Sequence, residues 1–256
     1  MIKFFRKIRQ QLMAEKKIGK YILYAVGEIV LVVIGIMIAV ALNNNNQLKK
    51  TKAEEQSYLL ALKEEFQFNK DRLAYMTKRN TANLNASLEL LEFVSPETPQ
   101  LAEDKFDEML QTVLMNEVQF SPSPGVLNEI INSGKLGSFS DPELKKAFGA
   151  WEAELIRVKF QEEEEVQRAR SELIKFANIH SNIRRGVARS RFAKQIGISN
   201  SKFKGQNQML LQMEAFENSL MDVILVSYFL NTSYYSPLDK QIDELLSLID
   251  ANIDKK

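Results

Sequence analysis

One carboxylate stands inside a long apolar run. Glu28 is the only charged residue between Ile22 and Leu42, and a charge within a membrane span costs on the order of 3 kcal/mol and usually marks a partner or a function. Seven helical steps of 100° bring Gly35 to within about 20° of Glu28, and eleven steps bring Ala39 to the same side. Glu28, Gly35 and Ala39 therefore share one face of the predicted helix.

This face has the composition of a helix–helix contact. Gly35-x-x-x-Ala39 is a small-xxx-small pattern, which lets two helices approach closely. We predict a seam within a homo-oligomer or against another membrane protein, with the carboxyl of Glu28 protonated or hydrogen-bonded there. Two other interpretations stay open: a lipid-facing or snorkelling carboxyl without a role, and a proton carrier in an accessory subunit of an energy-coupling or transport complex.

A block without acids is the second candidate site. Between Ser181 and Met213 there is no Asp or Glu, and the basic residues are Arg184, Arg185, Arg189, Arg191, Lys194, Lys202 and Lys204. Three glycines indicate a loop or broken helix. The block could bind an anionic lipid headgroup, a phosphate-bearing ligand or an acidic partner. The plainer interpretation is a solvated loop, or one that pairs with Glu162 to Glu165. Nucleic acid is not expected, because the block has few aromatic residues.

The inventory of catalytic side chains is poor. The chain has no cysteine and one histidine, His180, which excludes disulfides, thiolate sites and multi-histidine metal sites within one chain. Four consecutive helical acids from Glu162 to Glu165 point in different directions and cannot converge on one ion; Glu164 and Arg168 are predicted to form an exposed pair. No phosphate loop, nucleophile elbow or H-E-x-x-H is present. We predict no catalytic, cofactor or metal site; an enzyme of the outer domain is the contrasting class.

The apolar run has the length of an uncleaved membrane anchor. Its 21 residues from Ile22 to Leu42 span about 31 Å as a helix, the thickness of a hydrocarbon core. Residues 1–20 carry seven basic residues and one acid, against three lysines soon after the run, so the positive-inside rule predicts a cytoplasmic N-terminus. Ala39-Val40-Ala41 could instead be a signal-peptide cleavage site, but the apolar region would exceed the usual length of about 7–15 residues.

The N-terminal segment has an amphipathic pattern. Ile2, Phe5, Ile8 and Leu12 recur at helical spacing against a basic face. Residues 1–20 could therefore lie on an anionic inner leaflet. A disordered basic flank that serves only topology is the alternative.

The rest of the chain predicts an all-α fold. Apolar residues at three-four spacing run from Leu59 to Leu91, interrupted only by weak helix formers such as Asn80 and Asn83. VSPETPQ ends this first helix, and Gly134 and Ser140-Asp141-Pro142-Glu143 predict a helix stop and a helix cap. Further helices are predicted at 101–114, 126–131, 144–176 and 207–230, and at 238–253 after a break at Pro237.

Two stretches resemble a known family. MIKFFRKIRQ, followed by KYILYAVGEIVLVVIGI and an asparagine-rich exit, is similar to a family of uncharacterised single-pass membrane proteins common in flavobacteria and their relatives; GVLNEIINSGKLGSFSDPEL resembles the soluble part of that family. The chain departs from the family at Asn43 to Asn46, where members have Asn-Asn-Trp-Asn, so the interfacial tryptophan is missing. The resemblance implies a bacterial inner-membrane anchor with an extracytoplasmic helical domain, and it implies no activity.

Together these patterns predict four segments. They are a basic cytoplasmic segment at 1–20, a transmembrane helix at 21–42, a stalk or first bundle helix at 43–95 and a helical bundle domain at 96–256. Residues 43–256 are expected in the periplasm. The expected role is association or scaffolding at the bacterial inner membrane, without nucleic acid and without a cofactor.

Overall fold

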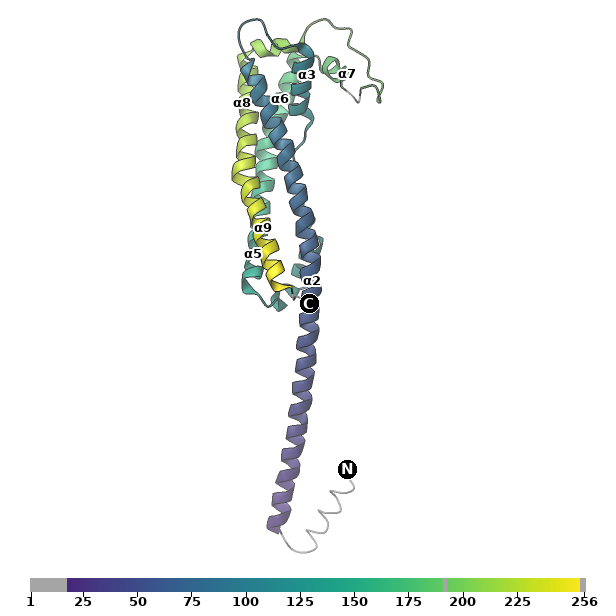
Figure 1. Cartoon of the computed structure of the whole chain (residues 1–256), viewed down its shortest axis with the longest axis vertical. Coiled ribbons are helices and arrows are strands. Elements are labelled where there is room, and N and C mark those ends of the chain that lie inside the picture. Colours follow the sequence, from purple (N-terminus) through teal and green to yellow (C-terminus); the bar gives the residue numbers. More distant parts are fainter. Residues whose placement is uncertain (1–17, 191–192, 254–256) are drawn as a thin grey trace. The chain divides into compact units, whose positions relative to one another are not determined.

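The computed structural model describes residues 18–190 and 193–253 of the chain. Every regular element within these ranges is helical, which confirms the predicted all-α class. The chain divides into two compact units, Met1–Ser57 and Tyr58–Lys256. We call the second unit the helical domain (Figure 1). Most of the predicted amphipathic segment at 1–20 lies outside the described residues.

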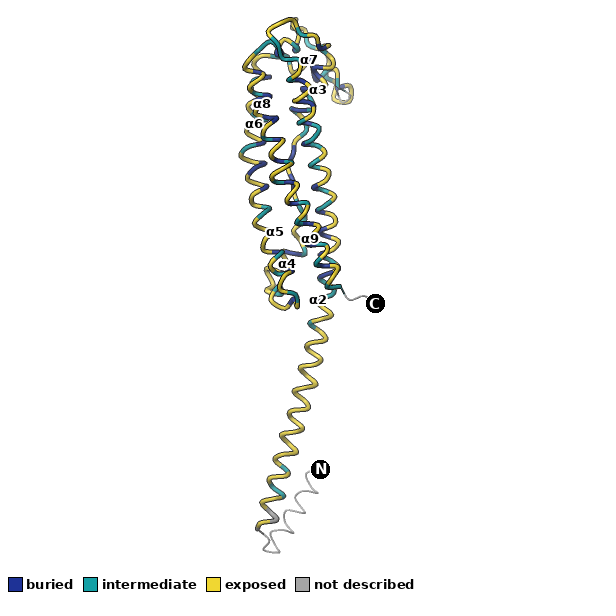
Figure 2. The backbone as a smooth tube through the Cα atoms, turned by 60° about the vertical axis from the view of Figure 1, so that its left-hand side comes forward, coloured by how far each residue is buried: buried dark blue, intermediate teal, exposed yellow. Residues whose placement is uncertain are grey.

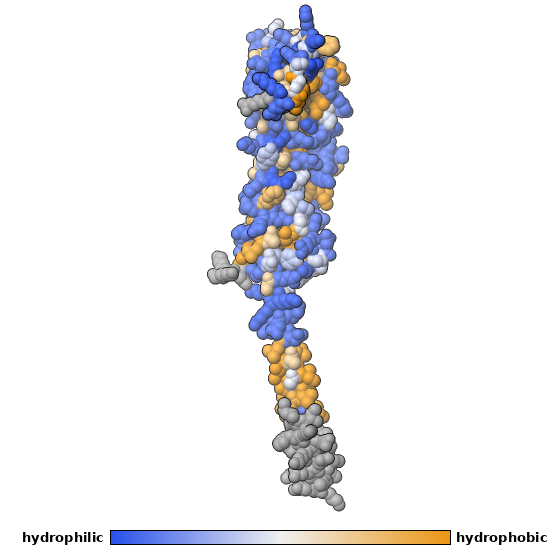
Figure 3. Space-filling model, turned by 90° about the vertical axis from the view of Figure 1, so that its right-hand side faces the viewer, coloured by the Kyte–Doolittle hydropathy of each residue, from blue (hydrophilic) through white to orange (hydrophobic). Residues whose placement is uncertain are grey.

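Helix α2, Ile18–Glu92, begins in the first unit and contributes residues to both units. Its large apolar side chains between Ile22 and Leu42 are exposed, and Figure 3 shows them as an apolar band. This part of α2 is long and apolar enough to cross a bilayer, so it is a candidate membrane span.

Two more long helical stretches form the helical domain together with the second half of α2. Each stretch continues through one wider π-helical turn: α5 (Pro142–Phe160), η2 (Gln161–Val166) and α6 (Gln167–His180), then α8 (Glu214–Phe229), η4 (Leu230–Tyr235) and α9 (Ser236–Asn252). Helix α5 packs on α9 and α6 packs on α8, so the two stretches are antiparallel. Their buried residues face one another in the interior (Figure 2).

Helix α2 is also antiparallel to the α8–α9 stretch. The Nζ of Lys63 lies 2.7 Å from a carboxylate oxygen of Asp250, and Lys70 pairs with Asp243. Further along α2, the Nδ2 of Asn80 donates to the carbonyl oxygen of Ser227 at 2.7 Å. Residue numbers therefore fall on one helix as they rise on the other.

Shorter elements connect the long ones, and their ends follow the predicted signals. They are α3 (Glu103–Met115), α4 (Gly125–Asn132), η1 (Lys135–Ser138), α7 (Ile183–Ala188) and η3 (Asn207–Gln212). Gly134 has φ 72°, the left-handed conformation that ends a helix without strain for glycine. Asp141 caps α5 by accepting from the backbone N–H of Glu143 at 2.8 Å, with Pro142 in the first turn.

Two predicted helix boundaries are wrong. Pro237 does not break the chain, because it lies in the first turn of α9 directly after the wide turn η4, where a missing N–H is tolerated. The helix predicted at 207–230 is divided at Met213, which has extended φ and ψ angles of −109° and 117° and separates the 3-10 turn η3 from α8.

Two apolar clusters fill the helical domain. The first contains Phe66, which packs against Phe148 and the edge of Trp151, and the second contains Phe106, Phe176 and Phe216. Five polar residues also join the long helices, and we call them the polar layer: Asn80, Glu162, Ser227, Asn231 and Tyr235, of which Tyr235 belongs to the first cluster. Both wide turns contribute residues to this layer.

Buried polar residues of α2 bind the backbone of neighbouring elements. The carboxylate of Glu65 accepts from the N–H groups of Val126 and Leu127 at 2.6 and 3.2 Å, and so caps the start of α4. Asn69 exchanges two hydrogen bonds with the backbone of Ser123. Asn83 donates to the carbonyl of Asn116 after α3. These polar residues interrupt the apolar pattern of α2 in the sequence because their side chains bind other elements and hold them in place.

Candidate functional site

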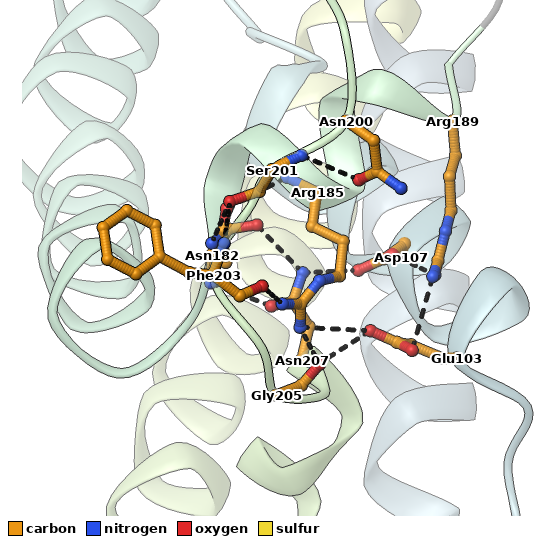
Figure 4. A network of polar contacts seen from close by, with 10 residues as sticks. All are labelled: Glu103, Asp107, Asn182, Arg185, Arg189, Asn200, Ser201, Phe203, Gly205 and Asn207. Carbon is orange, nitrogen blue, oxygen red and sulfur yellow. Dashed lines mark hydrogen bonds and ion pairs between the residues drawn. The ribbon is translucent and has the colours of Figure 1, made fainter.

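Part of the basic block folds onto helix α3. Arg185, in α7, is only 7% exposed. Its guanidinium donates to the carbonyl oxygens of Phe203 and Gly205 and lies 3.7 Å from a carboxylate oxygen of Glu103 (Figure 4). Arg185 therefore ties the following loop to α7 and α3.

A second arginine pairs with the same helix. The guanidinium of Arg189 lies 2.7 Å from Asp107 and 3.3 Å from Glu103. Asp107 is 2% exposed and also accepts from the Nδ2 of Asn207 at 2.9 Å. Burial raises the pKa of Asp107, while the bonds from Asn207 and Arg189 oppose that rise. We call Glu103, Asp107, Arg185, Arg189 and Asn207 the arginine network.

The network also fixes a close backbone approach. A Cβ added at Gly186 would lie 3.2 Å from Oδ1 of Asp107, and the carbonyl of Gly186 accepts from the Nε2 of Gln111 at 2.7 Å. A larger residue here would require Asp107 to shift, because α7 lies directly against the carboxylate. The short helix is thus held against α3 by its arginines and by its backbone.

The seven basic residues of the predicted site separate into groups. Arg185 and Arg189 form ion pairs with α3, whereas Arg184 binds the carbonyl and hydroxyl of Ser199 at 2.8 and 2.7 Å. Lys194, Lys202 and Lys204 are exposed. Arg191 lies outside the described residues. The acids that pair with the two network arginines are Glu103 and Asp107, and not the acidic run at 162–165.

That acidic run contains a buried carboxyl. Glu162 is 3% exposed, and its Oε1 accepts from the backbone N–H of Phe120 at 2.9 Å and from the hydroxyl of Tyr235. Burial raises the pKa of Glu162 to about 7. Burial, together with the nearby carboxyl of Glu162, also raises the pKa of Tyr235. Arg168 pairs at 2.9 Å with Glu165, and not with Glu164 as predicted.

The sequence carries one signal for this buried pair. Apolar spacing is interrupted at residues 162–165, yet the helix continues through them, so at least one acid must face the interior. π turns are often found at functional sites, and here η2 and η4 meet across the polar layer. A small hollow of about 130 Å³ lies beside Glu162, lined by Glu117, Val118, Gln119, Glu163 and Gln167.

Two depressions of similar volume lie on the helical domain, and both are open to solvent. One of about 580 Å³ borders Asp107, Gln111 and Arg189, beside the arginine network, and one of about 590 Å³ borders Leu60 and Ile253. Within the described ranges no three His, Asp or Glu side chains are placed to hold a metal ion. The buried polar groups of the network bind one another and the backbone.

The predicted membrane face lies on the exposed part of α2. Gly35 and Ala39 are exposed and Glu28 is partly exposed. A Cβ added at Gly35 would meet no atom within 4 Å. At Gly35 and Ala39 this face is therefore open to a neighbour.

Over residues 18–190 and 193–253 these features define an all-α protein with one candidate membrane-spanning helix, in which the buried polar contacts join elements and indicate no activity. The chain belongs to a family of unknown function, DUF6090, which matches residues 28–181. The matched range contains the GVLNEIINSGKLGSFSDPEL stretch and Glu162, and it ends before the basic block. No curated protein and no solved structure matches the chain.

Proposed function

We propose that the chain is a single-pass protein of the bacterial inner membrane that associates with other membrane helices. Its N-terminus would lie in the cytoplasm and residues 43–256 in the periplasm. The observation that carries this proposal is the exposed apolar part of α2, which bears one carboxylate and two small residues on one face. In a bilayer, such a face favours a helix neighbour because small residues permit close backbone packing.

The helical domain supports a role in association more than one in catalysis. Its described depressions are open, and its most buried titratable groups have partners within the fold. An active site usually has a deep pocket with converging polar groups. We therefore propose a scaffold that displays a rigid helical surface, and not an enzyme.

Cysteine crosslinking tests the membrane seam. The native chain has no cysteine, so Gly35→Cys and Val33→Cys each place one thiol in the span. Val33 is a matched control because it lies about 140° from Glu28 on an α-helix. We expect crosslinking in native membranes at position 35 and little at position 33. Equal crosslinking at both positions would remove the seam.

Substitution of Glu28 separates association from proton transfer. Glu28→Gln keeps a hydrogen-bonding side chain but cannot carry a proton. We expect it to retain most of the crosslinking at position 35, whereas Gly35→Leu should abolish association by blocking close approach. A Glu28→Gln variant that associates normally but loses a proton-driven cellular function would favour the accessory-subunit interpretation.

Labelling of intact cells tests the topology. A membrane-impermeant maleimide should label a cysteine at Glu64, an exposed position of the helical domain, and should not label one at Lys7. The reverse pattern would contradict the positive-inside assignment. Release of a soluble product about 41 residues shorter would show cleavage after Ala41 and remove the anchor.

A further inference from the structure

One aromatic side chain of the basic block is displayed in solvent. Phe203 is 81% exposed, more than any other large apolar side chain in the described residues, including those of the candidate span. Full exposure of a phenyl ring forgoes about 2 kcal/mol of burial energy. The ring points away from the arginine network in Figure 4.

The backbone beneath this ring is fixed. The buried Arg185 binds the carbonyl oxygens of Phe203 and Gly205, and the N–H of Phe203 donates to Ser201 Oγ at 3.2 Å. Ser201 Oγ in turn accepts from the Nδ2 of Asn182 at 2.9 Å. The ring is therefore exposed on a loop whose backbone is held in place by hydrogen bonds.

Basic residues flank the ring in the sequence. Lys202 precedes Phe203 and Lys204 follows it, both lysines are exposed, and no acid occurs between Ser181 and Met213. The network acids Glu103 and Asp107 already pair with Arg185 and Arg189. We call Lys202, Phe203 and Lys204 the KFK tip. The tip is thus apolar at its centre and cationic at its edges.

We propose that the KFK tip docks on a bilayer surface that contains anionic phospholipid. The phenyl ring of Phe203 enters the interface below the headgroups, and the Nζ atoms of Lys202 and Lys204 bind the lipid phosphates. A projecting ring with flanking lysines suits this surface, since lysine stems extend along apolar surface while their ammonium groups stay at the headgroups. A protein partner would instead need a pocket shaped for one convex ring.

The same loop exposes a second apolar side chain. Ile196 is 62% exposed, and Lys194 nearby in sequence is exposed. Separately projecting apolar and basic side chains can all contact one lipid surface without a fixed complementary shape. The inference does not depend on the membrane seam at Glu28, because it uses only residues of the helical domain.

A single fluorophore tests the docking in the full chain. Gln206→Cys, at an exposed position beside the tip, carries an environment-sensitive dye and leaves the KFK tip intact. The protein is held in a nanodisc of neutral phosphatidylcholine, and vesicles with or without phosphatidylglycerol are added; a second nanodisc contains phosphatidylglycerol itself. Tyr228→Cys, exposed on α8, is the matched control position.

We expect the dye at position 206 to brighten with phosphatidylglycerol, in its own nanodisc or in added vesicles, and the dye at 228 not to respond. Phe203→Ser should weaken the response by about tenfold or more, as should Lys202→Gln with Lys204→Gln, because one apolar and two charged contacts are lost. All these side chains are exposed, so an unchanged unfolding curve confirms that the variants fold.

Several results would overturn the proposal. A response that Phe203→Ser leaves unchanged would mean electrostatic adsorption without insertion, and an equal response to neutral vesicles would remove the role of the lysines. A dye that stays in water with every lipid, yet is shielded in native membranes, would assign the tip to a protein partner instead.

Discussion

The hydroxyl of Tyr235 donates a hydrogen bond to Oε1 of Glu162, where the wide turns η4 and η2 meet at the first apolar cluster. The N–H of Phe120 donates to the same oxygen. Oε2 is therefore the atom that can carry a proton without loss of either bond. Each partner has little contact with solvent, at 3% and 1% exposure.

This pair predicts a pH-dependent stability. The pKa of Glu162 in the folded chain is about 7 against an ordinary value of 4.5, so the folded state binds more protons than the unfolded state between these pH values. The stabilisation is complete below about pH 4.5 and is lost as pH rises through about 7, a change on the order of 3 kcal/mol.

Glu162→Gln tests this dependence, because glutamine resembles the protonated carboxyl. We expect the variant to be more stable than the native chain at pH 8 and to gain little at pH 5, measured by urea unfolding of the full chain in detergent. Glu164→Gln, at an exposed position in the same turn, is the control. Equal pH profiles for native and Glu162→Gln protein would show that Glu162 does not titrate in this range.

Removal of the tyrosine hydroxyl tests the hydrogen bond itself. Tyr235→Phe keeps the ring in the core and should destabilise the chain by about 1–3 kcal/mol, most strongly above pH 7 where Glu162 is charged. Tyr228→Phe, whose side chain is half-exposed on α8, should change the unfolding free energy by less than about 0.5 kcal/mol. A similar loss for both variants would contradict a specific role for Tyr235.

Two glycine substitutions should have opposite signs. Gly186→Ala places a methyl group against Asp107, which Arg189 and Asn207 hold in position, so we expect a loss of about 1–3 kcal/mol. Gly149→Ala, in α5 with open space at its Cβ, should gain about 0.5–1 kcal/mol from helix propensity. Thermal unfolding of the two variants measures both effects, and a stabilised Gly186→Ala would show that Asp107 can shift.

Removal of the α2 carboxylate that caps α4 should loosen that short helix. Glu65→Ala removes the acceptor for the first N–H groups of α4, and we expect a cost of about 1–2 kcal/mol. Amide exchange of Val126 and Leu127 should accelerate more than that of residues in α9. Glu64→Ala, exposed one residue earlier, should leave these amides protected; if it has the same effect, the cap is not the cause.

Signals between neighbours in the sequence predict most of the helices. They predict few of the contacts between helices. Periodicity predicts α2, and Gly134 and Asp141 mark a helix stop and a helix cap, because these depend on neighbours in sequence. Pro237 and Met213 were misjudged because a wide turn and a 3-10 turn depend on packing. Nothing local distinguishes Glu162 from Glu163, or Arg185 from Arg184. Their burial depends on η4 and α3, which are distant in sequence.

The polar layer also bears on how the long helices align. Asn80 meets Ser227 and Asn231, and Glu162 meets Tyr235, only in one relative position of the three stretches. A slip of one turn would place these polar groups among leucines and phenylalanines, where each unpaired group costs about 1–3 kcal/mol. Apolar clusters alone tolerate such slips, as repetitive helical seams do. The layer therefore fixes the axial register of the helical domain.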